Sequence, residues 1–239
     1  MAKLHVLMKK EELEEHRLPG KVVVVLDVLF ATSSIAAALH HGATEVVPAL
    51  DAGAARAEAA RRPPGSCVLA GELGSDLLPG FGAPTPLALL GQGITGRSLI
   101  YSTTNGTVAL ARATSAARVY AASLLNGRAV VEHLQREAGG GSVLLVCSGS
   151  AGTFNLEDFY GAGYLVSLLR ERSPGHELSD AAQAALAVHE RTDPLACLSQ
   201  SRVGRTMLDR GLADEVAFAA RKDALPVVPL LSGGALRRA

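Results

Sequence analysis

Short runs rich in apolar residues alternate along this chain with longer segments typical of helices. The runs occupy residues 21–26, 45–47, 67–70, 98–102, 118–122 and 143–146. Those at 21–26 and 143–146 are nearly continuous, as expected of strands covered on both faces. We predict helices at residues 33–41, 52–62 and 127–137, with Gly42 ending the first and Asp51 and Asn126 capping the other two. This alternation is typical of an α/β fold.

The rest of the chain favours helices. They are expected over residues 156–209, with an interruption at 173–175, and two short strands at 215–218 and 227–230 end the fold. Residues 71–96 are rich in Gly and Pro, which predicts a loop that carries function. We therefore predict one domain over residues 1–239, a three-layer α/β/α sandwich with a mixed, mostly parallel sheet. Both halves share a plan of buried strand, polar turn and helix, and we leave open whether they form two pseudo-symmetric lobes.

Composition narrows the class of protein. Of the 239 residues, 48% are hydrophobic, which is enough for a sizeable core and argues against disorder. Lys and Arg together number 23, as do Asp and Glu, so we expect no nucleic-acid partner. The apolar runs are far shorter than the roughly 20 residues that cross a membrane, so we expect no membrane partner either.

Cysteine usage favours the cytoplasm. Cys67, Cys147 and Cys197 form no C-x-x-C pattern and cannot all pair, which is typical of a reducing compartment. Residues 1–6 also lack the long apolar core of a secretory signal. We therefore expect a cytoplasmic protein, and we leave open whether it forms a homodimer.

An unusual polar turn follows the apolar run at residues 98–101. It consists of Ser102, Thr103, Thr104, Asn105, Gly106 and Thr107. Hydroxyl and amide donors are combined there with a glycine that lets the backbone approach a ligand, just before a predicted helix. Such a turn suits a phosphate, because free N–H groups and the helix dipole point at it. The alternative is an ordinary polar turn that caps the helix.

Acidic residues follow three other apolar runs. Asp27 comes directly after residues 21–26, Glu72 comes two residues after 67–70, and Glu157 and Asp158 come after 143–146. Burying such an acid is costly unless it meets a cation or hydrogen-bond donors. Carboxylates gathered at one edge of the sheet, beside a phosphate turn, suit Mg²⁺. Alternatively, Asp27 caps the next helix, and Glu157 and Asp158 lie in a first helical turn.

Several familiar chemistries do not fit. No G-x-x-x-x-G-K-[ST] motif is present, and the G-x-G-x-x-G pattern at residues 91–96 precedes a strand, so we interpret it as a turn. Cysteine-dependent phosphatases need an arginine six residues after their nucleophile, but Thr153 holds that place after Cys147. We therefore expect Cys147 to be a buried, unreactive thiol. Leu29 replaces the second acid of the commonest aspartyl-phosphate motif.

Taken together, these motifs resemble the 2-phosphosulfolactate phosphatase family over nearly the whole chain. The resemblance rests on D-V-L at 27–29, G-E at 71–72, G-F at 80–81, the turn at 102–107 and F-N-L-E-D at 154–158. It implies a Mg²⁺-dependent hydrolase that converts (2R)-phospho-3-sulfolactate and water to sulfolactate and phosphate, a step toward coenzyme M. It also implies a three-layer α/β/α fold.

The chain departs from the family pattern at two places. Phe30 stands where an arginine normally follows D-V-L, and the loop at 80–86 is shorter and lacks the family's acid and asparagine. An aromatic ring cannot replace a guanidinium that binds phosphate or sulfonate, so the physiological substrate is left open. Phe30 either lines the mouth of the site or packs in the core, and in the second case Arg202 or Arg205 would supply the missing charge.

We predict that the protein hydrolyses a small phosphorylated metabolite. Asp27 and Glu72 are the predicted catalytic residues and Mg²⁺ ligands, with Glu157 or Asp158 as a further ligand. Asp27 is left open as metal ligand, general base or nucleophile. The predicted phosphate-binding residues are Thr32, Ser33, Ser102, Thr103, Thr104, Asn105, Gly106, Thr107, Ser148, Gly149 and Gly152. The alternative is a binding protein that kept the phosphate turn but lost turnover.

Overall fold

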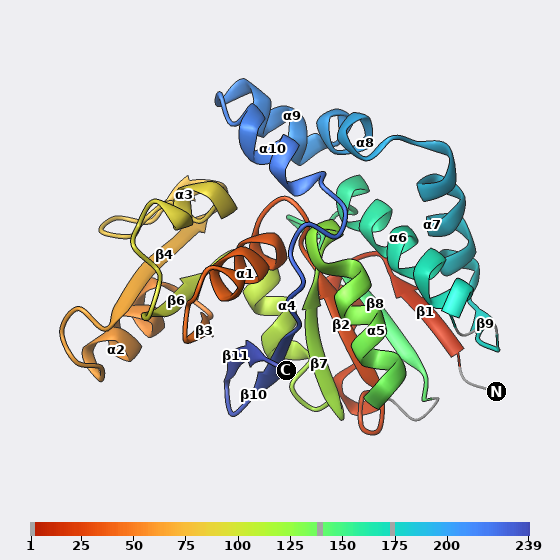
Figure 1. The fold of residues 1–239 in the computed structure, drawn as a ribbon, viewed down its shortest axis with the longest axis horizontal. Helices are drawn as coiled ribbons and strands as arrows, with labels where there is room; N and C mark the ends of the chain where they lie inside the picture. The colour runs from red at the N-terminus through yellow and green to blue at the C-terminus, as the bar shows by residue number, and fades with distance from the viewer. Residues whose placement is uncertain (1–2, 138–140, 173–174) are drawn as a thin grey trace.

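The computed structural model describes residues 3–137, 141–172 and 175–239, and Figure 1 shows their arrangement. These residues form one sheet of 11 strands in the order β5-β4-β6-β3-β11-β10-β7-β2-β8-β1-β9. In chain order the strands are β1 (Lys3–Leu7), β2 (Val22–Leu26), β3 (Glu45–Ala49), β4 (Cys67–Leu73), β5 (Asp76–Leu77), β6 (Ser98–Ser102), β7 (Arg118–Ala122), β8 (Val143–Cys147), β9 (Glu177–Leu178), β10 (Pro229–Ser232) and β11 (Ala235–Arg238).

Helices connect the strands and cover the sheet. In chain order they are α1 (Ala31–His40), α2 (Ala52–Ala60), α3 (Pro86–Leu90), α4 (Gly106–Arg112), α5 (Gly127–Glu137), α6 (Leu156–Arg172), α7 (Asp180–Arg191), α8 (Pro194–Gln200), α9 (Arg202–Asp209) and α10 (Ala213–Ala219). Short 3₁₀ turns lie at η1 (Lys10–Glu12), η2 (Glu15–Arg17) and η3 (Leu124–Asn126). No described helix is both long enough and apolar enough to cross a membrane.

The sheet consists of two parallel blocks joined by the C-terminal hairpin. Strands β4, β6 and β3 form the smaller block, and β7, β2, β8 and β1 form the larger. Between them, β11 pairs antiparallel with β3 and β10 pairs antiparallel with β7, so the hairpin lies between the blocks in Figure 1. The predicted α/β class, with a mixed and mostly parallel sheet, is confirmed.

Strand β2 is buried on both faces, which explains its almost unbroken apolar sequence. Val22, Val24 and Leu26 face a core shared with α5, α6 and α7. Val23 and Val25 face a second core shared with α1 and α4. Because successive strand residues point to opposite faces, both layers of helices need an apolar residue at every position of β2.

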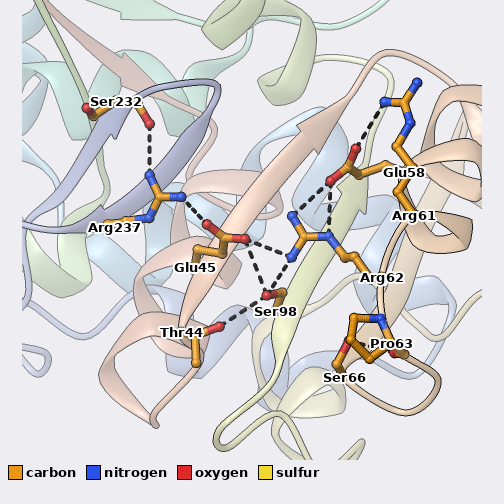
Figure 2. Close-up of polar contacts among 10 residues, drawn as sticks. All are labelled: Thr44, Glu45, Glu58, Arg61, Arg62, Pro63, Ser66, Ser98, Ser232 and Arg237. Atoms are coloured by element: carbon orange, nitrogen blue, oxygen red, sulfur yellow. Dashed lines mark hydrogen bonds and ion pairs between the residues drawn. The ribbon is translucent and has the colours of Figure 1, made fainter.

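A polar network attaches the hairpin to the smaller block (Figure 2). Arg237 of β11 pairs with Glu45 at the start of β3, and Glu45 also accepts a 2.8 Å hydrogen bond from Arg62. Arg62 in turn donates to Ser98 at the start of β6 and to Glu58 of α2. Burial alone would raise the pKa of Glu45, but Arg62 and Arg237 lower it. Three strands and a helix are therefore joined by one cluster of charges.

Most of the predicted elements are found. The strands at 98–102 and 118–122 and the helix at 127–137 have the predicted boundaries. Asp51 caps α2 by accepting a hydrogen bond from the backbone of Ala54, and Gly42 follows the end of α1 with a φ of +96°. Asn126, however, does not cap α5, because its Oδ1 accepts a hydrogen bond from the backbone of Ser123 within η3.

The predictions for the C-terminal part were partly wrong. Residues 215–218 lie in α10, where Val216 and Ala219 pack into the core one helical turn apart. The final strand was expected at 227–230, but β10 begins at Pro229, and β11 follows it. The predicted loop at 71–96 contains β5 and α3. Of the predicted interruption at 173–175, residues 173–174 lie outside the described residues.

Candidate active site

A cavity of about 450 Å³ brings together the polar ends of several strands. The turns after β2, β6 and β8 line it with β4, and α9 and the turn after it line the opposite side. We call helices α8–α10 the roof, which runs along the top of Figure 1. A cavity of this size is typical of a small-molecule site. The polar lining consists of Asp27, Glu72, Ser75, Thr85, Thr104, Asn105, Ser150, Asn155, Glu157, Arg202, Thr206 and Arg210.

The carboxylate of Asp27 lies where two helices begin. It accepts hydrogen bonds from the backbone N–H groups of Ala31 in α1 and Gly106 in α4. Burial and the charges of Glu72 and Glu157 raise the pKa of Asp27 to about 7, although the two N–H groups lower it. The contact with Ala31 matches the alternative in which Asp27 caps α1. A residue that only caps α1 would need neither the contact with Gly106 nor the neighbouring acids Glu72 and Glu157.

Gly106 allows α1 and α4 to approach each other this closely. A Cβ atom at Gly106 would lie 2.6 Å from Oδ2 of Asp27 and 2.4 Å from the Cβ of Ala31. Gly106 is not among the residues with a positive φ, so its backbone conformation does not require glycine. The requirement comes from the approach of the backbone to Asp27.

Glu72 holds the turn that follows β6. Its Oε1 accepts a 2.7 Å hydrogen bond from the N–H of Thr104, and its Oε2 contacts the Thr104 hydroxyl at 3.1 Å. Oε2 also accepts a 2.6 Å hydrogen bond from the N–H of Ser75. Glu72 therefore lines the cavity as predicted, and its hydrogen bonds fix the position of Thr104 and its neighbour Asn105.

Of the two acids in the first turn of α6, Glu157 faces the cavity and Asp158 does not. Asp158 accepts hydrogen bonds from the N–H groups of Val28, at 2.9 Å, and Gly149, at 3.2 Å. It thus connects the turns after β2 and β8. Oε2 of Glu157 is buried without a hydrogen-bond partner among the described residues. Burial raises the pKa of Glu157, although Ser201 and Arg202 lower it.

These acids fit a divalent cation held by one or two carboxylates. A cation would satisfy Oε2 of Glu157 and relieve the repulsion that raises the pKa of Asp27. In the part of the chain that the structure describes, no three His, Cys, Asp or Glu side chains form a metal-binding group. Mg²⁺ does not need one, because it keeps several waters and also binds phosphate oxygens of a substrate. Glu157 fits this ion best, because its Oε2 has no partner among the described residues. Asp27 accepts two backbone hydrogen bonds and so retains more capacity than Glu72, whose oxygens accept three.

Lys10 lies behind the predicted phosphate turn, and the sequence analysis did not identify it. Its buried ammonium donates to Oδ1 of Asn105 at 2.9 Å and to the carbonyl of Ser148 at 3.3 Å. It also pairs with Glu11 at 3.2 Å. Because Oδ1 of Asn105 accepts from Lys10, Nδ2 is the donor end of the amide. Nδ2 has no hydrogen-bond partner among the described residues, so it is free to bind an anion.

Of the predicted phosphate ligands, Thr104 and Asn105 line the cavity. The others do not: Thr32, Ser33, Ser102, Thr103, Gly106, Thr107, Ser148, Gly149 and Gly152. The hydroxyl of Thr32 bonds to the backbone of Asp27, and those of Thr103 and Thr107 bond within the start of α4. This part of the turn matches the alternative of a polar turn that caps a helix.

The roof adds two arginines to the cavity. Arg202 donates through Nη2 to Ser150, Thr153 and Asn155, and its Nε and Nη1 have no partner among the described residues. Arg210 pairs with Asp76 at 3.1 Å. The sequence analysis named Arg202 as a source of positive charge, but it did not include Arg210 or Ser150 among the site residues.

The structure resolves the alternatives for Phe30. Its side chain lines the cavity and also packs against the core. Arg202 lines the same cavity, whereas Arg205 bonds to the carbonyl of Gln200 outside it. Cys147 is buried as expected, and burial raises the pKa of its thiol well above the usual value.

The comparisons with known proteins agree with these motifs. The sequence model of the 2-phosphosulpholactate phosphatase family matches residues 7–234. A Carboxydothermus hydrogenoformans protein named "Probable 2-phosphosulfolactate phosphatase" is 37% identical over 228 residues, which is 95% of this chain and 92% of that protein. Proteins of the same name from Symbiobacterium thermophilum and Parasynechococcus marenigrum are 36% identical over 220 residues and 40% identical over 211. These cover 91% and 86% of this chain, and 94% and 87% of the relatives.

Replacing Gly106 with alanine should destabilise the protein, because the new Cβ overlaps Asp27 and Ala31. Overpacking of this kind costs about 1–3 kcal/mol of unfolding free energy, measurable by urea denaturation. Gly91→Ala is the matched control, since its Cβ would meet only the carbonyl of Ala88, at 3.5 Å, within 4 Å. Equal stability of the two variants would show that the close approach of α1 and α4 is unimportant.

Stability should depend on pH through Asp27. Its pKa is raised on folding, so the folded state keeps the proton between about pH 4 and pH 7 while the unfolded state loses it. In EDTA, the unfolding free energy of the wild type should therefore fall relative to that of Asp27→Asn as the pH rises through this window. The change is at most about 4 kcal/mol. A difference between the two proteins that stays constant from pH 4 to pH 7 contradicts the raised pKa.

Lys10→Met should weaken the binding of orthophosphate, because Asn105 then loses the donor that orients its amide. We expect the dissociation constant, measured by calorimetry, to rise about tenfold, which corresponds to about 1.4 kcal/mol. Lys9→Met is the control, because Nζ of Lys9 donates instead to the carbonyl of Gly152, which does not line the cavity. If both variants bind phosphate as the wild type does, Lys10 has no such role.

Proposed function

Because this chain belongs to the 2-phosphosulfolactate phosphatase family, we propose that it hydrolyses a small phosphomonoester in a Mg²⁺-dependent reaction. The first candidate substrate is (2R)-phospho-3-sulfolactate, the ester for which the relatives are named. Hydrolysis would release sulfolactate and phosphate, a step toward coenzyme M. The observation that carries the proposal is the cavity in which the carboxyl groups of Asp27 and Glu157 lie with the unpaired donors of Asn105 and Arg202.

The phosphate group would be held by side chains that still have free donors. Nδ2 of Asn105 and the Nε and Nη1 atoms of Arg202 have no partner among the described residues, and both residues line the cavity. A guanidinium can bind two phosphate oxygens at once. The single proton of the Thr104 hydroxyl is directed at Glu72. Thr104 therefore serves to keep Asn105 in place.

Asp27 and Glu157 would hold Mg²⁺. When bound, the ion would neutralise charge on the phosphate and on the leaving oxygen. Backbone N–H groups of Ala31 and Gly106 hold the carboxylate of Asp27 in one orientation, so its position does not depend on the substrate. Asp158 in turn fixes the backbone of Val28, next to Asp27, and the turn after β8. The chain thus brings an anionic pair and cationic and amide donors into one cavity.

We place this activity in the cytoplasm, and two observations support that placement. All three cysteines are free thiols, which is typical of proteins in a reducing compartment. The proposed substrate is also a small phosphorylated metabolite. Neither the activity nor its location requires a nucleic acid or a membrane as partner.

Asp27→Asn should abolish Mg²⁺-dependent release of phosphate while leaving the fold intact. Asparagine keeps the shape of the side chain but lacks the charge that holds the ion, so we expect kcat/KM to fall at least about a hundredfold. The assay follows phosphate release from a panel of phosphomonoesters, with Mg²⁺ or with EDTA. Asp51→Asn is the matched control, because Asp51 is an exposed cap of α2 and asparagine caps a helix equally well.

Two outcomes would contradict this proposal. Full turnover by Asp27→Asn would show that Asp27 acts only as a helix cap. A wild-type protein that binds phosphomonoesters but releases no phosphate with Mg²⁺ would instead be a binding protein that kept the phosphate turn without turnover.

A further inference from the structure

The apolar lining of the cavity is concentrated on elements that carry none of its acids. Most of it comes from β5, from the segment before and within α3, and from α9 and the turn after it. These residues are Leu77, Ala83, Pro84, Ala88, Val203, Met207 and Leu212, and the exceptions are Phe30, after β2, and Ala151, after β8. Asp27, Glu72 and Glu157 belong instead to the turn after β2, to β4 and to α6. The acids and most of the apolar lining therefore belong to different elements, and we call these two parts of the cavity its polar half and its apolar half.

Arg202, the first residue of α9, has free donors, and these are assigned to the phosphate. The other polar side chains that line the cavity from α9, from the turn after it and from the segment before α3 already have partners. Thr85 donates to Glu215 at 2.6 Å, and Thr206 donates to the carbonyl of Arg202 at 3.1 Å. The charge of Arg210 is matched by Asp76. Once Arg202 binds the phosphate, the apolar half therefore offers a ligand no unpaired cation among the described residues. A second strong anion placed there would lose its hydration without gaining a partner.

Part of this apolar surface is left open to solvent. Leu77 is 56% exposed although it lines the cavity, and Val203 and Leu212 are only half-buried. Val203 and Met207 lie four residues apart on α9, which places them on one face of the helix. An apolar group in this half would therefore remove apolar surface of both the ligand and the protein from water. The gain is about 0.8 kcal/mol for each methylene buried, or about fourfold in binding.

We propose that this half is a subsite for an apolar group of the substrate. The preferred esters then carry an alkyl or aryl group beside the carbon that bears the phosphate, where 2-phosphosulfolactate carries its sulfonate. This proposal rests on the proposed phosphatase function and specifies its substrate class. Leu77, Val203, Met207 and Leu212 are the residues that would set the preference.

The test is a series of 2-O-phosphates of lactate, 2-hydroxybutyrate, 2-hydroxyvalerate and 2-hydroxyhexanoate, with 2-phosphosulfolactate as the anionic comparison. We expect kcat/KM of the wild type to rise about fourfold for each added methylene. The longer esters should also be hydrolysed with a higher kcat/KM than 2-phosphosulfolactate. Phosphate release with Mg²⁺ measures both.

A pair of matched variants locates the effect. Leu77→Asn should remove much of the rise along the series, whereas Leu73→Asn should leave it unchanged. Both leucines are exposed and lie on the β4–β5 hairpin, but only Leu77 lines the cavity. Since neither side chain is buried, both variants should fold, which their melting temperatures would verify.

The outcomes separate this proposal from the proposed function. If 2-phosphosulfolactate is hydrolysed best and kcat/KM does not rise along the series, the phosphatase function stands and the apolar subsite is wrong. If no ester is hydrolysed, the proposed function fails, and calorimetry with the same intact esters still tests the subsite. Dissociation constants that do not fall with chain length, or that fall equally in Leu77→Asn and the wild type, would then overturn it.

Discussion

The contact between Asp27, Ala31 and Gly106 is the constraint on which the site depends. Asp27 and α1 belong to the larger parallel block, whereas Gly106 begins the helix that follows β6 of the smaller block. The missing side chain of Gly106 lets the two helix N-termini share one carboxylate. An acid directly after a fully buried strand is tolerable because two backbone N–H groups meet it. The same contact brings polar turns from both blocks into one cavity.

The roof depends on a second set of polar contacts, each to a different part of the site. Arg202 holds the turn after β8, and Arg210 holds the β4–β5 turn. Glu215 accepts hydrogen bonds from Thr85, Leu87 and Ala88, so a carboxylate of α10 satisfies the N–H groups at the start of α3. The contacts reach elements of both sheet blocks. A displacement of the roof would therefore affect the polar and the apolar half of the cavity together.

The sequence predicted what short-range patterns determine. Continuous apolar runs predicted the strands. The polar residues that follow these runs include Asp27, Glu72, Glu157, Thr104 and Asn105, which all line the cavity. The sequence could not identify groups that reach the site from distant elements. Lys10 lies beside Ser148 because β1 pairs with β8, and it contacts Asn105 because the turns after β6 and β8 line the same cavity. A strand was predicted at residues 215–218 because a short stretch of sequence does not show that they pack as a helix against the core. Of the hydroxyl residues predicted to bind phosphate, Thr104 lines the cavity and the others do not, since sequence cannot distinguish a helix cap from a ligand-binding group.

The charges that line the cavity affect both of its proposed ligands, the divalent cation and the phosphate ester. Asp27, Glu72 and Glu157 face two arginines, and one of these, Arg210, is already paired with Asp76. Without a cation, a phosphate entering this cavity would meet more negative than positive charge. Burial raises the pKa of Asp27, and the charges of Glu72 and Glu157 raise it further. A divalent cation reverses the balance at the polar half while leaving the apolar half without an unpaired charge. The same arrangement of side chains therefore has two consequences. The proposed reaction depends on a metal, and the preferred ester is held by polar groups at its phosphate and by apolar contacts elsewhere.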